Sequence, residues 1–175
     1  KQKKRLMSHK PKKVPAIPIY DDEFLQLLEE LNKKREKKAA ERYIFLIQLM
    51  NVYGIRAHEG PHLYVQVIND KKAVFCDSNK TTELGESPDN RELYGLHPHW
   101  EKEFDLINKI ENNYPLPPKG DQGLGDALGK YLAKIEYWNH LRETRNLVPY
   151  SFRHGFAWRM HQDGRYRNKI SSRMG

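Results

Sequence analysis

The spacing of apolar residues is the feature that most limits how this 175-residue chain can fold. Over residues 21–52, apolar side chains recur at the three- and four-residue intervals that predict helices. The first helix is expected to begin at Asp21 and Asp22, whose side chains can cap it. The second is expected to run from Lys34 to Val52 and to end at Gly54, a usual C-terminal capping residue.

The helical spacing then gives way to short runs with strand character. Leu63–Ile68 and Ala73–Cys76 are predicted to be strands around an Asn69-Asp70 turn, and a third strand is expected over Glu92–Leu96. Further helices are predicted at His99–Glu111, Asp126–Arg145, Ser151–His161 and within the last ten residues. The predicted fold class is therefore α+β, mostly α-helical, with one small three-stranded antiparallel sheet.

Length and composition favour a single intracellular domain. Residues 1–18 are polar, basic and interrupted by three prolines, so they are predicted to form a linker or arm ahead of a folded domain over 19–175. The single cysteine, Cys76, excludes an internal disulfide and fits a reducing compartment. No apolar run approaches the roughly 20 residues that a membrane span needs, and no signal peptide is visible.

The positive charge lies at the two ends of the chain. Residues 1–15 hold seven basic and no acidic residues, and residues 141–175 hold eight basic and two acidic ones. The stretch between them has 16 basic and 21 acidic residues. Clustered positive charge is typical of proteins that bind a polyanion such as nucleic acid, although a solvated basic tail gives the same pattern.

Two motifs resemble a zinc site and a nucleotide-binding loop but lack residues or geometry that those sites require. His58-Glu59-Gly60-Pro61-His62 has the HExxH spacing of zinc proteases, which need both histidines on one face of a continuous helix. Gly60 and Pro61 disfavour that helix. The segment from Gly123 to Lys130 lacks the spacing and the Ser/Thr of a nucleotide-binding loop. We therefore expect neither a metal nor another cofactor.

Two arginines about a hundred residues apart carry a stronger signal. Arg56 follows the long helix, and Arg153 lies between Phe152 and Phe156 on the core side of a predicted helix. An unpaired guanidinium there would be costly, so Arg153 needs an anion. Chemistry alone leaves two options open: a protein carboxylate such as Glu59, or a phosphate held by both arginines.

Both arginines lie in segments that resemble motifs of the tyrosine recombinases of phage-integrase type. Tyr53-Gly-Ile-Arg56-Ala-His-Glu59 resembles the first arginine box of that family, and Val148-Pro-Tyr150-Ser-Phe-Arg153-His154-Gly-Phe-Ala157 resembles the second. Between them, Asn79-Lys80-Thr81 and the stretch 92–100 are similar to the lysine-bearing hairpin. The likeness runs from about Pro15 to Gly175 and is greatest to integrases of cyanobacteria and their mobile elements.

The resemblance implies a fold, a substrate and a reaction. Family members integrate or excise mobile elements by cutting and rejoining double-stranded DNA through a 3′-phosphotyrosyl intermediate, without metal or other cofactor. The partners implied are DNA and further recombinase protomers, as dimers or tetramers, in the bacterial cytoplasm at the nucleoid. The alternative is a non-catalytic DNA-binding module that keeps the recombinase fold.

The same resemblance assigns roles to individual residues. Arg56 and Arg153 would hold the non-bridging phosphate oxygens, while Lys80 would protonate the leaving 5′ oxygen. Lys80 is preferred to two lysines of the neighbouring turn because it matches the Lys-Thr of the family hairpin. Tyr150 stands where the commoner pattern has histidine, so we expect it to position the phosphate rather than shuttle a proton.

Supporting roles fall to Glu59, which would orient the first-box arginine, and to His154, which would pack and hydrogen-bond. The arm is expected to contact the DNA backbone through its basic side chains: Lys3, Lys4, Arg5, Lys12 and Lys13. Tyr166 lies only 13 residues after Arg153, too close to be the family nucleophile, which we expect beyond Gly175. The chain by itself is therefore predicted to bind DNA weakly and not to cleave it.

Overall fold

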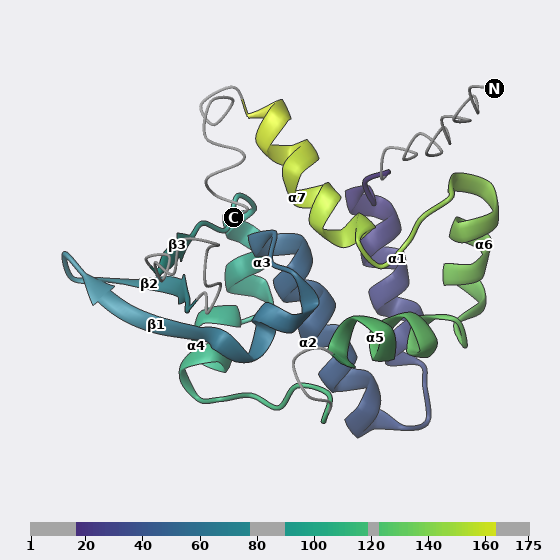
Figure 1. Ribbon diagram of the computed structural model, residues 1–175, viewed down its shortest axis with the longest axis horizontal. Coiled ribbons are helices and arrows are strands. Elements are labelled where there is room, and N and C mark those ends of the chain that lie inside the picture. The colour runs from purple at the N-terminus through teal and green to yellow at the C-terminus, as the bar shows by residue number, and fades with distance from the viewer. Residues whose placement is uncertain (1–16, 78–89, 119–122, 164–175) are drawn as a thin grey trace, which may run out of the picture.

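The computed structural model describes residues 17–77, 90–118 and 123–163, and Figure 1 shows their arrangement. Helices surround a central helix, and a small sheet projects from one side of them. The predicted fold class, mostly α-helical with a three-stranded antiparallel sheet, is confirmed. The boundary proposed between an arm and a folded domain stays a prediction, since residues 1–16 lie outside the described ranges.

Helix α1 (Asp21–Asn32) begins after Tyr20, which is the N-cap in place of the expected aspartates. The backbone amide of Tyr20 donates to Glu23 Oε1 at 3.0 Å, so Glu23 supplies the capping contact. Asp21 and Asp22 lie instead in the first turn, where negative charge interacts favourably with the helix dipole. Glu23 also accepts a hydrogen bond from Arg145 Nη1 at 3.0 Å, which fastens the start of α1 to a distant helix.

Helix α2 (Lys37–Tyr53) is the centre of the molecule, and its second half is buried on all sides. It ends at Gly54, as predicted, with φ at 71° and with the Gly54 amide bonded to the Met50 carbonyl at 3.0 Å. A Cβ at Gly54 would lie 2.3 Å from a ring carbon of Phe156. Both the left-handed backbone and the contact with Phe156 therefore require glycine.

The sheet consists of β1 (Leu63–Ile68), β2 (Lys71–Cys76) and β3 (Arg91–Leu93), paired antiparallel in that order. Asn69 and Asp70 both have positive φ, as a tight two-residue hairpin turn requires. The third strand is shorter than predicted and begins one residue earlier. Its register places Arg91 opposite Cys76.

The helix predicted over His99–Glu111 is wrong as a single element. It is divided into α3 (Pro98–Glu103) and α4 (Leu106–Glu111) by Asp105, whose φ of 54° is left-handed and ends the first helix. Aspartate tolerates this conformation better than most residues because its short side chain can hydrogen-bond locally, and Asp105 accepts from Asn108 Nδ2 at 2.9 Å. The division lets α4 turn onto the sheet, where it packs against β1.

The helix predicted over Asp126–Arg145 is also divided, into α5 (Leu124–Leu132) and α6 (Glu136–Arg145). Ile135 between them is extended, with φ at −101° and ψ at 116°, and its side chain is buried. Burial of this isoleucine in the core outweighs the helical preference of the local sequence.

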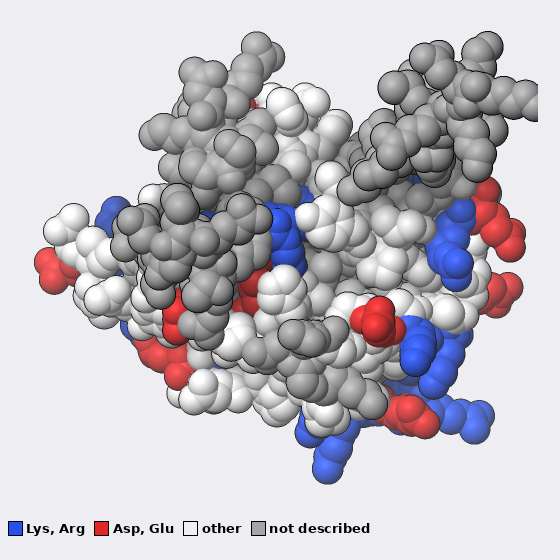
Figure 2. Space-filling model, in the orientation of Figure 1, with Lys and Arg blue, Asp and Glu red and all other residues white. Residues whose placement is uncertain are grey.

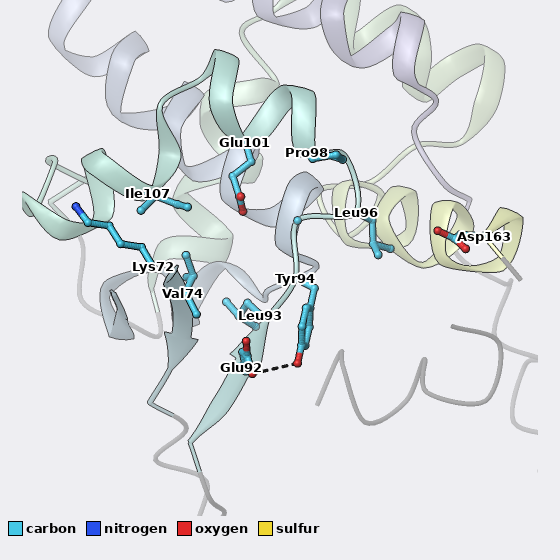
Figure 3. A pocket seen from close by; sticks show the side chains of 12 residues that line it. Lys72, Val74, Glu92, Leu93, Tyr94, Leu96, Pro98, Glu101, Ile107 and Asp163 are labelled. Carbon is cyan, nitrogen blue, oxygen red and sulfur yellow. Dashed lines mark hydrogen bonds between the residues drawn. The ribbon is translucent and has the colours of Figure 1, made fainter. Parts of the chain in front are cut away.

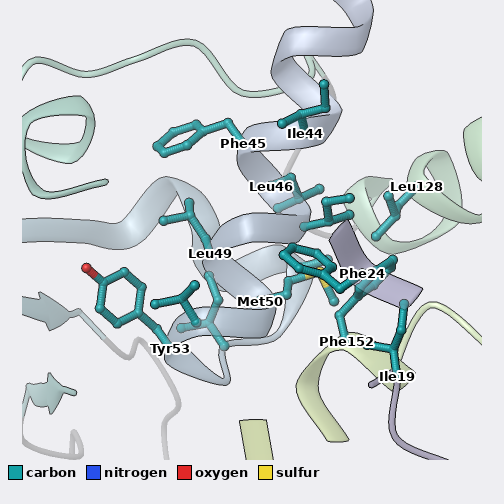
Figure 4. Close-up of a cluster of buried hydrophobic side chains, with 14 of the residues drawn as sticks. Ile19, Phe24, Ile44, Phe45, Leu46, Leu49, Met50, Tyr53, Leu128 and Phe152 are labelled. Carbon is teal, nitrogen blue, oxygen red and sulfur yellow. The ribbon is translucent and has the colours of Figure 1, made fainter. Parts of the chain in front are cut away.

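Helix α7 (Ser151–Gln162) confirms the helix predicted over Ser151–His161 and packs across α2. The helix predicted within the last ten residues lies outside the described ranges. The core between α1, α2, α5 and α7 is rich in large side chains, several of which Figure 4 shows around α2. Phe152 at the start of α7 meets Phe24 of α1 at 6.1 Å and Trp138 of α6 at 5.4 Å between ring centroids. These aromatic contacts fix where α7 begins.

The segment with the HExxH spacing forms η1 (Ala57–His62), a 3-10 helix with Pro61 inside it. It is therefore not the α-helix on which zinc proteases mount their two histidines. No helix in the described ranges is both long and apolar enough to cross a membrane.

Candidate active site

Arg56 and Arg153 are brought together at the junction of α2 and α7. Arg56 directly precedes η1, two residues after the end of α2, and Arg153 lies in the first turn of α7. Arg153 is only 2% exposed, and its Nε donates to the carbonyl of Gly54 at 2.7 Å. The residue that ends α2 therefore also holds the second arginine in place.

The two guanidinium groups lie close enough to interact electrostatically. Burial lowers the pKa of Arg153 below its ordinary value, and the positive charge of Arg56 lowers it further. The hydroxyl of Tyr150 accepts a hydrogen bond from Arg153 and raises the pKa of that arginine. Like charges held together in a partly buried site favour the binding of an anion.

Glu59 lies beside this pair, but its side chain is directed elsewhere. Its Oε1 accepts from the backbone amide of Arg56 at 2.7 Å, and its Oε2 lies 3.0 Å from Arg91 Nη2. Glu59 is 5% exposed, and burial by itself would raise the pKa of its carboxyl group. The Arg56 amide and the Arg91 guanidinium outweigh burial, so the pKa of Glu59 is lowered and the group is ionised.

Arg91 is the residue of this site that sequence reasoning missed. It stands at the start of β3, with its side chain 12% exposed, and no apolar periodicity marks it. Only the strand register, which sets Arg91 opposite Cys76, brings it to Glu59. The Cys76 thiol donates to Glu59 Oε2 at 3.6 Å, and burial together with the Glu59 charge raises the pKa of that thiol to about 12.

The formal charges of this group do not cancel. Arg56, Arg91 and Arg153 carry three positive charges, and Glu59, the one carboxylate among these four side chains, carries one negative charge. The formal charge of the group is therefore +2. The option that Glu59 alone satisfies the arginines is disfavoured, because Arg91 already occupies one of its oxygens.

Arg56 borders a pocket of about 540 Å³, which we name the arginine pocket. Its polar lining residues are Arg56, His58 and Tyr150, and Gly125 and Leu128 of α5 also line it. Tyr150 is 41% exposed, so its hydroxyl is accessible from the pocket as well as to Arg153. An anion in the pocket could therefore meet a guanidinium and a phenol at once.

His154 packs behind Tyr150, with 4.9 Å between the ring centroids. Burial and then the charge of Arg153 lower the pKa of His154, so its imidazole is neutral at neutral pH. This environment agrees with packing against Tyr150 and gives no sign of a group that exchanges protons near pH 7.

Arg159 holds α7 against its neighbours on the far side of the helix. Its guanidinium donates to Asp21 Oδ1 at 3.2 Å and also bonds the backbone carbonyl of Asn51. It lies 5.5 Å from the centroid of the Trp100 ring. Arg159 therefore links α7 to α1, α2 and α3, and this also was not apparent from the sequence.

A second pocket, of about 320 Å³, lies between β3 and α3 and is shown in Figure 3. Its charged lining residues are the carboxylates of Glu92, Glu101 and Asp163 and the ammonium of Lys72. Lys72 is in turn paired with Glu111 at 2.8 Å. An excess of carboxylates makes this pocket unsuited to a phosphate.

The other predicted site residues lie outside the described ranges: Lys80 and the arm residues Lys3, Lys4, Arg5, Lys12 and Lys13. Tyr166, which was excluded as the nucleophile, lies outside them as well. The two lysines of the β1–β2 turn, Lys71 and Lys72, are described. They lie at the opposite end of β2 from Cys76, about 15 Å from it at 3.3 Å per residue.

Comparison with known proteins supports the fold. No protein-family model matches the chain, and no curated protein matches it. Among solved structures, the XerH site-specific recombinase bound to its difH substrate in a pre-cleavage complex superposes with a TM-score of 0.51 and 19% identity. The alignment covers 95% of this chain and 52% of that one. The chain has the fold of a tyrosine recombinase.

A second structure of XerH, the post-cleavage complex with palindromic difH, gives the same TM-score with 17% identity over 90% of this chain and 48% of the other. The chain thus spans about half the length of the solved recombinases that it matches. The tyrosine-recombinase fold expected from the two arginine boxes is confirmed. The expected origin in a cyanobacterial mobile element stays a prediction.

Proposed function

We propose that this chain is the catalytic domain of a site-specific DNA recombinase that cleaves and rejoins strands through a 3′-phosphotyrosyl intermediate. The observation that carries the proposal is the group of Arg56, Arg91, Arg153 and Glu59, with its formal charge of +2, beside an open pocket. The negative charge on a phosphoryl group rises from one toward two in the transition state of its transfer. Fixed cationic donors lower the free energy of that state.

In the proposed reaction, a tyrosine hydroxyl attacks the phosphate and the 5′ oxygen of the next nucleotide leaves. Arg56 and Arg153 bind the non-bridging oxygens, and Tyr150 hydrogen-bonds one of them from the pocket wall. Lys80 supplies a proton to the leaving oxygen, as the resemblance to the family implies. A 5′ hydroxyl from a partner duplex then displaces the tyrosine, so no metal or nucleotide is consumed.

The neighbouring groups have supporting roles in this proposal. Glu59 binds the Arg56 backbone amide and thereby sets the direction of the first arginine, while Arg91 balances its charge. In the proposed complex, Arg91 accompanies the Glu59 carboxylate, and Arg56 and Arg153 bind the phosphate. Double-stranded DNA and further protomers bound to it are the partners proposed, with the element ends as target.

The decisive test is a covalent adduct. The protein, carried through the full reading frame, is incubated with duplex DNA from the ends of its parent element, and denaturant-resistant protein–DNA complexes are measured. We expect an adduct that Arg56→Ala and Arg153→Ala each reduce by at least about a hundredfold. Lys102→Ala, an exposed position on α3, is the control and should leave the yield unchanged.

Binding without an adduct would overturn the proposed chemistry. In that case the non-catalytic alternative, a DNA-binding module that keeps the recombinase fold, would account for the protein. The two arginine variants would then lower the affinity for DNA while no variant formed a covalent product.

A further inference from the structure

A second positively charged surface lies away from the arginine pocket. A cleft of about 420 Å³ separates the turn between α1 and α2 from the end of α5. It is lined by Lys33, Lys34, Arg35 and Lys134, by one carboxylate, Glu36, and by Tyr131 and Ile135. We name these seven residues the basic cleft; their formal charge is +3. Figure 2 shows lysine and arginine side chains gathered over this turn and beside α5.

Three of the four cations of the basic cleft have no carboxylate partner among the described residues. Arg91, Arg145 and Arg159 are each paired with a carboxylate within 3.2 Å. In the cleft, only Lys33 is so paired, with the exposed Glu30. Within the described ranges, no carboxylate oxygen lies within 4.0 Å of the charged nitrogens of the other three cleft cations.

The basic cleft and the arginine pocket share one helix. Gly125 and Leu128 of α5 line the arginine pocket, and Tyr131, one turn further along, lines the basic cleft. Residues three apart are neighbours on a helix surface, so Leu128 adjoins both Gly125 and Tyr131, which themselves point about 120° apart around the axis. At 1.5 Å per residue, Gly125 and Tyr131 are about 9 Å apart along the helix axis.

This spacing suits one continuous polyanion. Phosphates of a duplex strand advance by about 3.4 Å per base pair along the DNA axis, so about 9 Å corresponds to roughly three base pairs. We propose that the basic cleft binds the DNA backbone about three base pairs from the phosphate held by Arg56 and Arg153, with the duplex lying along α5. This inference rests on the proposed function and adds the path that the DNA takes across the protein.

Tyr131 gives the cleft a rigid wall. Its ring stacks on Tyr43 of α2, with 4.0 Å between centroids and an angle of 8° between planes. Burial raises the pKa of Tyr131, so its phenol stays protonated and can donate a hydrogen bond to a phosphate oxygen.

The test compares two pairs of substitutions that remove equal charge. Lys34→Gln with Lys134→Gln removes two cations from the cleft. Lys102→Gln with Arg142→Gln removes two exposed cations, one from α3 and one from α6. Affinity for duplex DNA is measured between 0.05 and 0.3 M salt, and the lysines that DNA protects from an amine-reactive reagent are identified by mass spectrometry.

We expect the cleft pair to weaken binding roughly ten- to sixtyfold at 0.1 M salt and to reduce the logarithmic salt dependence by about 1.8, the value for two lost phosphate contacts. The control pair should change affinity less than about threefold. In the unsubstituted protein, DNA should protect Lys34 and Lys134 from modification and leave Lys102 reactive.

The outcomes separate this inference from the function on which it rests. If Arg56→Ala and Arg153→Ala weaken DNA binding while the cleft pair behaves like the control pair, the path along α5 is wrong and the proposed function stands. If polyglutamate protects the cleft lysines and duplex DNA does not, the cleft binds an acidic protein segment and the inference fails. If the protein does not bind duplex DNA at all, both proposals fail.

Discussion

At the scale of single residues, the contact between Glu59 and Arg91 changes how the site is understood. The sequence offered Glu59 as one possible anion for the two arginines of the boxes. In the fold its Oε2 is paired with a third arginine at 3.0 Å, and its Oε1 caps the Arg56 amide. Glu59 therefore shapes the segment that carries Arg56 without neutralising the pair.

This pairing predicts an asymmetric response to substitution. Arg91→Met should lower the free energy of unfolding by about 3 kcal/mol, because it leaves a buried carboxylate without its cation. Adding Glu59→Gln to that variant should regain about 1–2 kcal/mol, since the amide oxygen can still accept from Arg56 and carries no charge. Urea unfolding measures both; a double variant less stable than Arg91→Met would contradict this account.

The same carboxylate predicts how stability depends on pH. The pKa of Glu59 is lowered from its ordinary value of 4.5 in the folded state. Its contribution to stability is therefore complete above about pH 4.5 and is lost as the pH falls through the lower, folded-state value. Thermal unfolding followed from pH 6 to pH 3 should show a shallower acid decline for Glu59→Gln than for the unsubstituted protein.

At the scale of elements, the end of α2 is where fold and site meet. Gly54 is left-handed, contacts Phe156 of α7 and accepts the hydrogen bond from Arg153. Gly54 thus ends α2, leaves room for Phe156 of α7 and binds Arg153 through its carbonyl. A change in the backbone conformation of the loop after α2 would therefore move Arg153.

Gly54→Ala should therefore lower the free energy of unfolding by more than about 2 kcal/mol and reduce DNA binding as well. The matched control is Gly125→Ala in the first turn of α5, where an added Cβ meets nothing within 4 Å. That substitution should be neutral or stabilising by up to about 1 kcal/mol, as for glycine to alanine in a helix. Equal effects of the two substitutions on thermal unfolding would contradict the role given to Gly54.

At the scale of the whole molecule, charge is distributed in a way that suits a long anionic substrate. The arginine pocket and the basic cleft both include residues of α5, while the charged residues that line the pocket between β3 and α3 are three carboxylates and one lysine. Acidic side chains also occur beside the cations, since Glu36 lines the basic cleft and Glu30 pairs with Lys33. In the proposed complex, the duplex would be attracted to the cationic pocket and cleft and repelled from the pocket between β3 and α3.

The basic arm should add affinity without specificity. Deleting residues 1–15, which hold seven basic residues, is expected to weaken binding by a similar factor on every duplex tested and to make it less sensitive to salt. Binding titrations on three unrelated duplexes would check this prediction. A loss confined to one duplex would show that the arm reads sequence.

The sequence by itself determined the helical class, the hairpin, the end of α2 at Gly54 and the pair of Arg56 and Arg153, because these depend on periodicity, turn residues and local motifs. The tertiary structure decided the rest. It divided two predicted helices, one at Asp105, whose backbone is left-handed, and one at Ile135, whose burial in the core outweighs local propensity. It also brought Arg91 to Glu59 across 32 residues, through a strand register that no local pattern encodes.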